Sequence, residues 1–268
     1  MKLPNKIVLG ERSLACYSSV MKALRLLVLP AFLFWAAAAL HAADKISFSR
    51  IRVLLITGGH GFEQQGFFSL FQTNADVKMI EAEQPAAQAM LKSDKAADYD
   101  VIVLYDLWQD ISDEAKAAFI SRLKEGKGLV VLHHALCSYQ KWPEYEKIIG
   151  GKYYLDKVTV NGVEQPASSY KHGMHFKIHV ADPNHPITRG ISDFEIDDET
   201  YKDFGVLSDS HPLLTTDEPT STKTLAWTRD YKGARVVYIQ SGHDHTAYEN
   251  PNYQRLLSQA IRWAAKRD

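Results

Sequence analysis

The chain has 268 residues, of which 46% are hydrophobic and 24% are charged, and its formal net charge is −1. This composition is that of an ordinary globular protein, and it excludes a disordered, collagenous or coiled-coil chain. The nearly balanced charge gives no electrostatic reason for binding nucleic acid or an anionic membrane surface.

The N-terminal segment has the three parts of a secretory signal peptide. A short basic region, Met21–Arg25, precedes the apolar stretch Leu26–Leu40, and small residues follow up to Ala42. This stretch is short for a membrane span, which needs about 20 apolar residues. We therefore expect residues 1–42 to be a leader in which the signal peptide starts at Met21. The alternative is an uncleaved anchor. The mature protein is then periplasmic or secreted, without a stable membrane span.

Removal of this leader leaves an acidic chain with a single cysteine. The leader holds five of the 31 basic and one of the 32 acidic residues, which leaves 26 and 31 and a net charge of −5. Of the two cysteines only Cys137 remains. An intrachain disulfide is therefore impossible, which excludes the disulfide-rich class of secreted proteins.

The first half of the mature chain alternates between strand and helix patterns. Short apolar runs predict buried strands, and amphipathic segments with Ser or Pro at their start predict helices. The expected strands are 50–57, 77–80, 99–106 and 129–133, and the expected helices are 67–72, 83–91, 112–125 and 142–149. This alternation predicts an α/β fold with a parallel sheet flanked by helices.

The second half is less regular at first. Asn161-Gly162 predicts a hairpin turn, residues 176–180 alternate like a half-buried strand, and the acidic run 195–199 is most simply a solvated loop. Further strands are expected at 212–215, 223–228 and 234–240, before a closing helix at 251–265. Since no Pro-, Ser- or Gly-rich linker divides the chain, we predict one domain over residues 46–268.

Histidines follow three of the predicted strands. His60 follows the first strand, His133 and His134 follow the fourth, and His243 follows the last. Parallel strands present their carboxyl ends at one edge of a sheet, where α/β proteins place their sites. Converging imidazoles suit a divalent metal such as Zn²⁺ or acid–base chemistry near neutral pH. We predict His60, His133 and His243 as metal ligands; the alternative is that each is a hydrogen-bonded structural residue.

The remaining polar signals are weaker. His172 and His175 have the spacing of metal ligands, but they fall in an expected loop. Cys137 lies four residues after His133, so we expect a buried residue rather than a nucleophile. Glu199 is our candidate for a general acid or base, or for a residue that orients a histidine.

Substrate-binding candidates lie near the same strand ends. The dinucleotide-binding spacing G-x-G-x-x-G is absent, so no nucleotide cofactor is expected. For the aromatic candidates the alternative is packing in the core. The predicted substrate-binding residues are Gly59, His134, Trp142, Tyr201 and Asp244.

Several motifs together resemble the ThuA-like (trehalose-utilisation) family. These are Leu54–Gly61, Gly128–Ala135 with Trp142–Glu146, Asn184–Ile187 with Asp197–Tyr201, and Leu225–Trp227 with Ser241–His243. The resemblance covers roughly residues 50–266. It implies the flavodoxin-like, class I glutamine amidotransferase-like fold: a doubly wound, mainly parallel sheet flanked by helices in a single domain.

The resemblance also bears on the site. In glutamine amidotransferases, the strand similar to Leu129–Leu132 ends in the nucleophilic cysteine, and the catalytic histidine follows a strand similar to Val236–Gln240. Those positions hold His133 and His243 here, which implies that glutaminase activity is lost. With Glu199, these two histidines are the predicted catalytic residues.

The family is associated with the breakdown of disaccharides, notably of 3-keto glucosides. We therefore expect an exported carbohydrate-active hydrolase, lyase or isomerase that acts on a disaccharide, glycoside or 3-keto sugar. The alternative is a non-catalytic periplasmic sugar-binding or accessory protein. The sequence is also compatible with a homo-oligomer.

Overall fold

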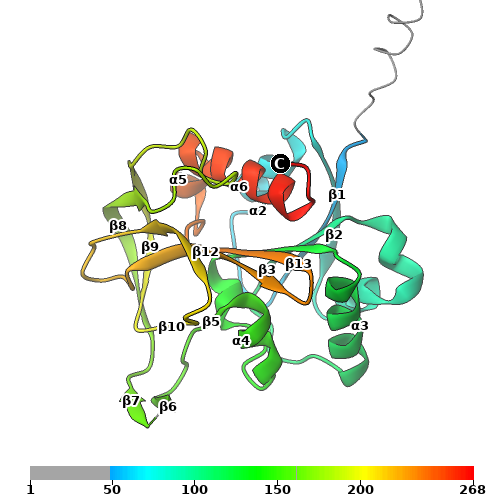
Figure 1. Ribbon diagram of the computed structural model, residues 1–268, viewed down its shortest axis with the longest axis horizontal. Helices are drawn as coiled ribbons and strands as arrows, with labels where there is room; N and C mark the ends of the chain where they lie inside the picture. Colours follow the sequence, from blue (N-terminus) through cyan, green and yellow to red (C-terminus); the bar gives the residue numbers. More distant parts are fainter. Residues whose placement is uncertain (1–48, 161) are drawn as a thin grey trace, which may run out of the picture. The chain divides into compact units, whose positions relative to one another are not determined.

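The central strands place their carboxyl ends along one edge, as the alternating pattern predicts. The structure, a computed structural model, describes residues 49–160 and 162–268 (Figure 1). The predicted leader over residues 1–42 and Asn161 of the predicted turn lie outside the described residues. Arg50–Asp268 forms one unit, and no helix in the described part is long and apolar enough to cross a membrane.

A mixed sheet of nine strands, counted within the described residues, runs through this unit in the order β2-β1-β3-β4-β13-β12-β11-β8-β9. The first five are parallel to one another, in the order 2-1-3-4-5 that flavodoxin-like folds use. They are β2 Val77–Glu83, β1 Ile51–Gly58, β3 Val101–Asp106, β4 Gly128–Leu132 and β13 Ala234–Ile239.

Four further strands extend the sheet by antiparallel pairing. They are β12 Thr224–Tyr231, β11 His211–Thr215, β8 Ser169–Val180 and β9 Phe194–Lys202. Two short antiparallel pairs lie outside the main sheet: β5 Gly151–Lys152 with β10 Gly205–Val206, and β6 Val158–Val160 with β7 Val163–Gln165. The β6–β7 pair flanks the predicted Asn161-Gly162 turn and confirms the hairpin.

Helices cover both faces of the sheet (Figure 1). One core joins α2 Gln64–Gln72 and α6 Pro251–Ala264 to strand residues such as Val53 and Leu55. The other joins α3 Asp113–Lys124 and α4 Pro143–Ile149 to the alternate residues such as Leu54 and Ile56. Since side chains alternate along a strand, one continuous apolar run supplies both cores.

Local sequence signals fix the helix ends. The Ser112 hydroxyl accepts a hydrogen bond from the Ala115 amide at the start of α3, as predicted. Pro143 opens α4, and Gly150 ends it in the left-handed conformation at φ +84°. Asn250 caps α6 by accepting hydrogen bonds from two amides of its first turn. These are the preferred residues for those positions.

Two of the predicted helices differ in the structure. Residues 83–91 complete β2 and form a 3₁₀-helix, η1 Ala86–Leu91, because the segment after Pro85 is too short for a stable α-helix. A second 3₁₀-helix, η2 Ser93–Asp98, follows it. The expected start of α2 at Phe67 is three residues late, since that helix begins at Gln64.

The acidic run is not a solvated loop. It lies in β9, where Phe194 and Ile196 are buried and Glu195 and Asp197 are exposed, which is the alternation of a half-buried strand. The expected loop around His172 is likewise part of β8. A shift in the pairing between Lys171 and Met174, at Gly173, interrupts the alternation and hides this strand in the sequence.

Candidate functional site

Two neighbouring parallel strands bring His133 and His243 together. Leu132, the last residue of β4, pairs with Ile239, the last residue of β13. His133 opens the 3₁₀-helix η3 His133–Cys137 with φ at +50°, a strained conformation for a residue with a side chain. Some α/β enzymes hold a nucleophile at a sharp strand-to-helix turn of this kind. His243 follows β13 after three residues, so both imidazoles lie at the predicted edge.

Glu199 of β9 completes a compact group with these two histidines. His133 Nε2 lies 3.1 Å from Glu199 Oε2 and 3.2 Å from His243 Nδ1, and His243 Nδ1 lies 3.4 Å from Glu199 Oε2. His133 and Glu199 are buried, and His243 is partly exposed. Within the described residues, these three form the group of possible metal ligands.

The group fits a divalent ion of zinc type. His133 Nδ1 lies 2.7 Å from the carbonyl oxygen of Gln240, so this nitrogen must carry a proton, and Nε2 is the nitrogen that faces the group. Metal-ligating histidines make this contact with a carbonyl. A tetrahedral ion with bonds of about 2.0–2.1 Å needs donor atoms about 3.3 Å apart. The three measured separations are close to that value.

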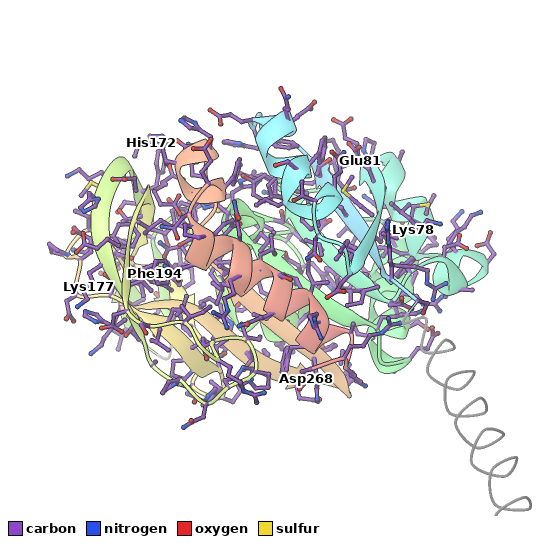
Figure 2. All side chains as sticks on the ribbon, turned by 90° about the horizontal axis from the view of Figure 1, so that it is seen from above. Lys78, Glu81, His172, Lys177, Phe194 and Asp268 are labelled. Carbon is purple, nitrogen blue, oxygen red and sulfur yellow. The ribbon has the colours of Figure 1, made fainter. Side chains whose placement is uncertain are left out.

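Charge interactions hold Glu199 ionised. Burial alone would raise the pKa of Glu199, but hydrogen bonds from His133 and His243 outweigh it and keep this pKa well below its ordinary value. The same contact with Glu199 raises the pKa of His243. The second carboxylate oxygen, Oε1, lies 2.9 Å from Nδ1 of His172, which is exposed on β8 (Figure 2). Three imidazoles therefore surround one carboxylate.

Asp198 fixes the backbone that carries His243. Its buried carboxylate accepts hydrogen bonds from the Gly242 amide at 2.8 Å and from the His243 amide at 3.1 Å. Burial raises the pKa of Asp198. From the other side, the Tyr105 hydroxyl donates to the Gly242 carbonyl and the Tyr248 hydroxyl to the His243 carbonyl. The loop is thus held on both sides by buried side chains.

A pocket of about 280 Å³ opens beside the group. The Tyr201 hydroxyl lies 2.9 Å from His133 Nε2, and the Tyr201 ring stacks on this imidazole. The Tyr153 ring packs edge-on against that of Tyr201. The walls are mainly apolar and aromatic, with a few polar groups, as is typical of small-molecule sites. The lining residues are His60, Leu107, Gln109, His134, Cys137, Tyr153, Leu155, Tyr170, His172, Glu199 and Tyr201.

His134 is a neutral histidine in this wall. Its Nε2 lies 3.3 Å from the carbonyl oxygen of Tyr105 and so carries the proton, and its Nδ1 has no hydrogen-bond partner within the described part of the chain. Burial, reinforced by His133 and His60, lowers the pKa of His134 well below its ordinary value. It therefore adds no charge to the pocket.

Several predicted residues meet in this region, and His60 takes a different place from the one expected. His133, His243 and Glu199 form the group, and His134 and Tyr201 line the pocket. His60 lines the pocket with its ring 4.7 Å from that of His134, and it is not part of the ligand group. Glu199 stands in the place where the metal prediction put His60.

Three other predicted residues have structural roles, and none of them is part of the described pocket wall. Gly59 has φ +81°, and a Cβ there would lie 2.0 Å from the Leu107 oxygen, so packing demands glycine. Trp142 packs edge-on against Phe119 in the core. Asp244 caps the short helix α5 His245–Tyr248.

Cys137 is buried, as predicted. It lines the pocket, and burial raises the pKa of its thiol to about 12. A thiol with this pKa is protonated near neutral pH and is a poor nucleophile. His172 and Asp198 are the residues whose place in the site the sequence did not reveal. The i, i+2 spacing of Glu199 and Tyr201, read as a strand, would have placed these two side chains on one face of the sheet.

A buried polar cluster supports the site from the other core. Asp106 ends β3 and is fully buried; its Oδ2 accepts hydrogen bonds from the Tyr139 hydroxyl at 2.7 Å and from Gln84 at 3.0 Å. The Asp106 carbonyl accepts a hydrogen bond from the Ser138 hydroxyl, just after η3. Burial, partly offset by these hydrogen bonds, raises the pKa of Asp106 from 3.8 to about 6.

We expect an Asp106→Asn variant to gain stability over the wild type as the pH rises. Because the folded pKa lies above the unfolded one, the contribution of this carboxyl is full below pH 3.8 and is lost as the pH rises through about 6. Asparagine is neutral throughout. The difference of about two units between the folded and unfolded pKa corresponds to a change of about 3 kcal/mol in the free energy of unfolding. Urea unfolding at pH 4 and pH 8 measures the difference in free energy of unfolding between the variant and the wild type. The same difference at both pH values would contradict the prediction.

The fold and the site together define a class: an α/β protein with a flavodoxin-like order of parallel strands and a His–Glu–His group at their carboxyl ends. The profile of the ThuA family, described as trehalose utilisation, matches residues 40–264. The chain belongs to the ThuA family. This confirms the resemblance that the sequence motifs indicated.

Solved structures agree on the fold. A ThuA-like protein from Parabacteroides merdae is 22% identical, with a TM-score of 0.66 over 81% of this chain and 90% of its own. Another, from Bacteroides uniformis, is 18% identical, with a TM-score of 0.62 over 81% and 91%. A β-galactosidase from Bacillus circulans is 9% identical, with a TM-score of 0.52 over 80% of this chain and 31% of its own. A search of curated proteins gave no match.

Proposed function

We propose that this chain is an exported, metal-dependent enzyme of sugar breakdown that cleaves an oxidised (3-keto) glycoside. The observation that carries the proposal is the group of His133 Nε2, His243 Nδ1 and Glu199 Oε2, separated by 3.1–3.4 Å, with the proton of His133 directed to the Gln240 carbonyl. These three atoms lie at the spacing that a tetrahedral coordination shell requires.

The sugar substrate is supported by the family and by the pocket. The family is described by trehalose utilisation. The pocket beside the group has a volume of about 280 Å³, near the lower end of the range for small-molecule sites, which suits one sugar ring. Tyr153 and Tyr201 contribute aromatic atoms to the pocket wall, and His172 contributes an exposed imidazole, so both the C–H face and a hydroxyl group of a sugar find partners.

The surrounding residues can move the proton that such a cleavage requires. A bound divalent ion would polarise the carbonyl oxygen of the oxidised sugar. His172 donates its Nδ1 proton to Glu199, which leaves Nε2 as the basic nitrogen of a residue that lines the pocket. That nitrogen would take the proton from the carbon beside the carbonyl. The electron pair then expels the glycosidic oxygen from the next carbon, and water or an acid returns a proton to it.

Export rests on the N-terminal sequence. The basic region before Leu26–Leu40 and the small residues up to Ala42 support passage through a membrane and cleavage. The proposed mature enzyme then works outside the cytoplasm, where it meets glycosides before uptake. N-terminal sequencing of the protein recovered from the periplasm would locate the cleavage site.

We expect His133→Ala and His243→Ala each to reduce the metal content and the sugar turnover strongly. Each variant removes one of three ligands, so the remaining pair should hold the ion at least about 100-fold more weakly. Metal analysis after gel filtration, together with turnover of 3-ketotrehalose, measures both effects. His211→Ala is the matched control, because His211 is an exposed histidine on β11 that pairs with Asp182.

The outcomes separate the two functions. Wild-type metal content and wild-type turnover in both site variants would contradict a metal-dependent enzyme. Calorimetric sugar binding that survives in His243→Ala, combined with no product from the wild type by mass spectrometry, would instead identify a sugar-binding or accessory protein.

A further inference from the structure

Exposed apolar side chains cluster at the mouth of the pocket. Within the described residues, the large hydrophobic side chains that stay exposed are Leu155, Val163 and Tyr170, at 54%, 58% and 62%. Leu155 and Tyr170 both line the pocket of the His–Glu–His group. Single exposed apolar residues are common on proteins. Two of them on the same pocket form a patch, and such patches mark ligand or partner sites.

The sheet holds Tyr170 at a fixed distance from the reacting group. In the β8–β9 pair, Tyr170 lies directly opposite Tyr201, whose hydroxyl contacts His133. Residues opposite each other in antiparallel strands share a face of the sheet. The Tyr170 ring also packs edge-on against His172, at 5.1 Å between ring centres, and His172 in turn contacts Glu199. Tyr170 is thus the outer end of a row of contacts that runs through His172 to Glu199.

Together these observations define an inner and an outer part of the site. The inner pocket of about 280 Å³ suits a single sugar ring. The inner walls are buried aromatic residues, among them Tyr153 and Tyr201, whereas Leu155 and Tyr170 lie outside them and face solvent. A second ring attached to the first through its glycosidic oxygen would emerge at this rim.

We propose that Tyr170 and Leu155 form an outer subsite for the second ring of a two-ring glycoside. This inference rests on the proposed function and deepens it: the substrate is a disaccharide or a similar two-ring glycoside, and the leaving ring is recognised by stacking on the Tyr170 face. Leu155 and Tyr170 are both uncharged, so this rim suits the C–H face of a neutral ring.

The experiment compares two substrates that differ only in the second ring: 3-ketotrehalose and methyl 3-keto-α-glucoside. Tyr170→Ala should raise KM for 3-ketotrehalose about tenfold, the scale of one aromatic contact. KM for the methyl glycoside should stay within twofold of the wild type. Tyr170→Phe keeps the ring and should restore the wild-type KM. Val163→Ala removes an exposed apolar side chain on β7, away from the pocket, and is the matched control.

A second variant protects the test against a folding defect. Leu155→Ser changes the same rim outside the main sheet and should give the same selective rise in KM if Tyr170→Ala does not fold. An equal rise for both substrates, or no rise in either variant, would overturn the outer subsite while leaving the proposed function intact. Wild-type protein that turns over neither substrate and binds neither by calorimetry would overturn both.

Discussion

A Glu199→Gln variant is expected to lose zinc binding by at least about 100-fold and sugar turnover with it. Glutamine has nearly the same shape as glutamate, but it carries no negative charge to interact with His133 and His243. It also replaces one of the two carboxylate oxygens, such as the one that faces His172, by an amide nitrogen. Loss of even an indirect partner of a ligand costs 10- to 100-fold in metal affinity. Calorimetric titration of metal-stripped protein with ZnCl₂ measures the change.

Glu195→Gln is the matched control for that variant. Glu195 lies on the same strand, β9, but it is exposed and pairs with His175 outside the pocket. Its substitution should leave zinc affinity within twofold of the wild type. If Glu199→Gln bound zinc as tightly as Glu195→Gln, the carboxylate would not be a ligand, and the metal assignment would be wrong.

Replacing Asp198 by alanine is expected to destabilise the fold by roughly 3 kcal/mol. The variant leaves the Gly242 and His243 amides buried without their acceptor, and each such loss costs about 1–3 kcal/mol. The relief of a buried, desolvated carboxylate offsets part of this cost. Urea unfolding at neutral pH measures the difference.

The same substitution should weaken zinc binding although Asp198 is not in the ligand group. His243 would lose the contact that fixes its backbone, so one ligand becomes less well placed. Asp197→Ala is the control, since Asp197 is the exposed neighbour that pairs with His175. Stability of Asp198→Ala within about 0.5 kcal/mol of this control would show that the loop is held by the tyrosine contacts instead.

The parallel half of the fold could be predicted because its signals are local. The apolar runs that became β1, β3, β4 and β13 are continuous, and the caps of α3, α4 and α6 use residues with strong positional preferences. The antiparallel half was harder. In β8 the shift at Gly173 breaks the alternation, and in β9 buried acids replace the apolar residues that mark a strand.

The site follows the same division. His133 and His243 could be placed together because they follow parallel strands, and that argument needs only the carboxyl-edge rule. Glu199 and His172 come from the strands at the far end of the sheet order, so their approach depends on how the whole sheet curves around this edge. His60 follows a parallel strand as well, but its side chain packs against His134 rather than joining the group. Strand order places a residue at an edge and does not set the direction of its side chain.

We infer that His133, Glu199 and His243 together hold one divalent ion beside the pocket. The most direct test is anomalous diffraction at the zinc absorption edge from crystals of zinc-loaded protein. We expect one strong peak within about 2.0–2.2 Å of His133 Nε2, His243 Nδ1 and Glu199 Oε2. A fully loaded crystal with no peak there, or with its peak at the exposed His175–Asp197 pair, would contradict it.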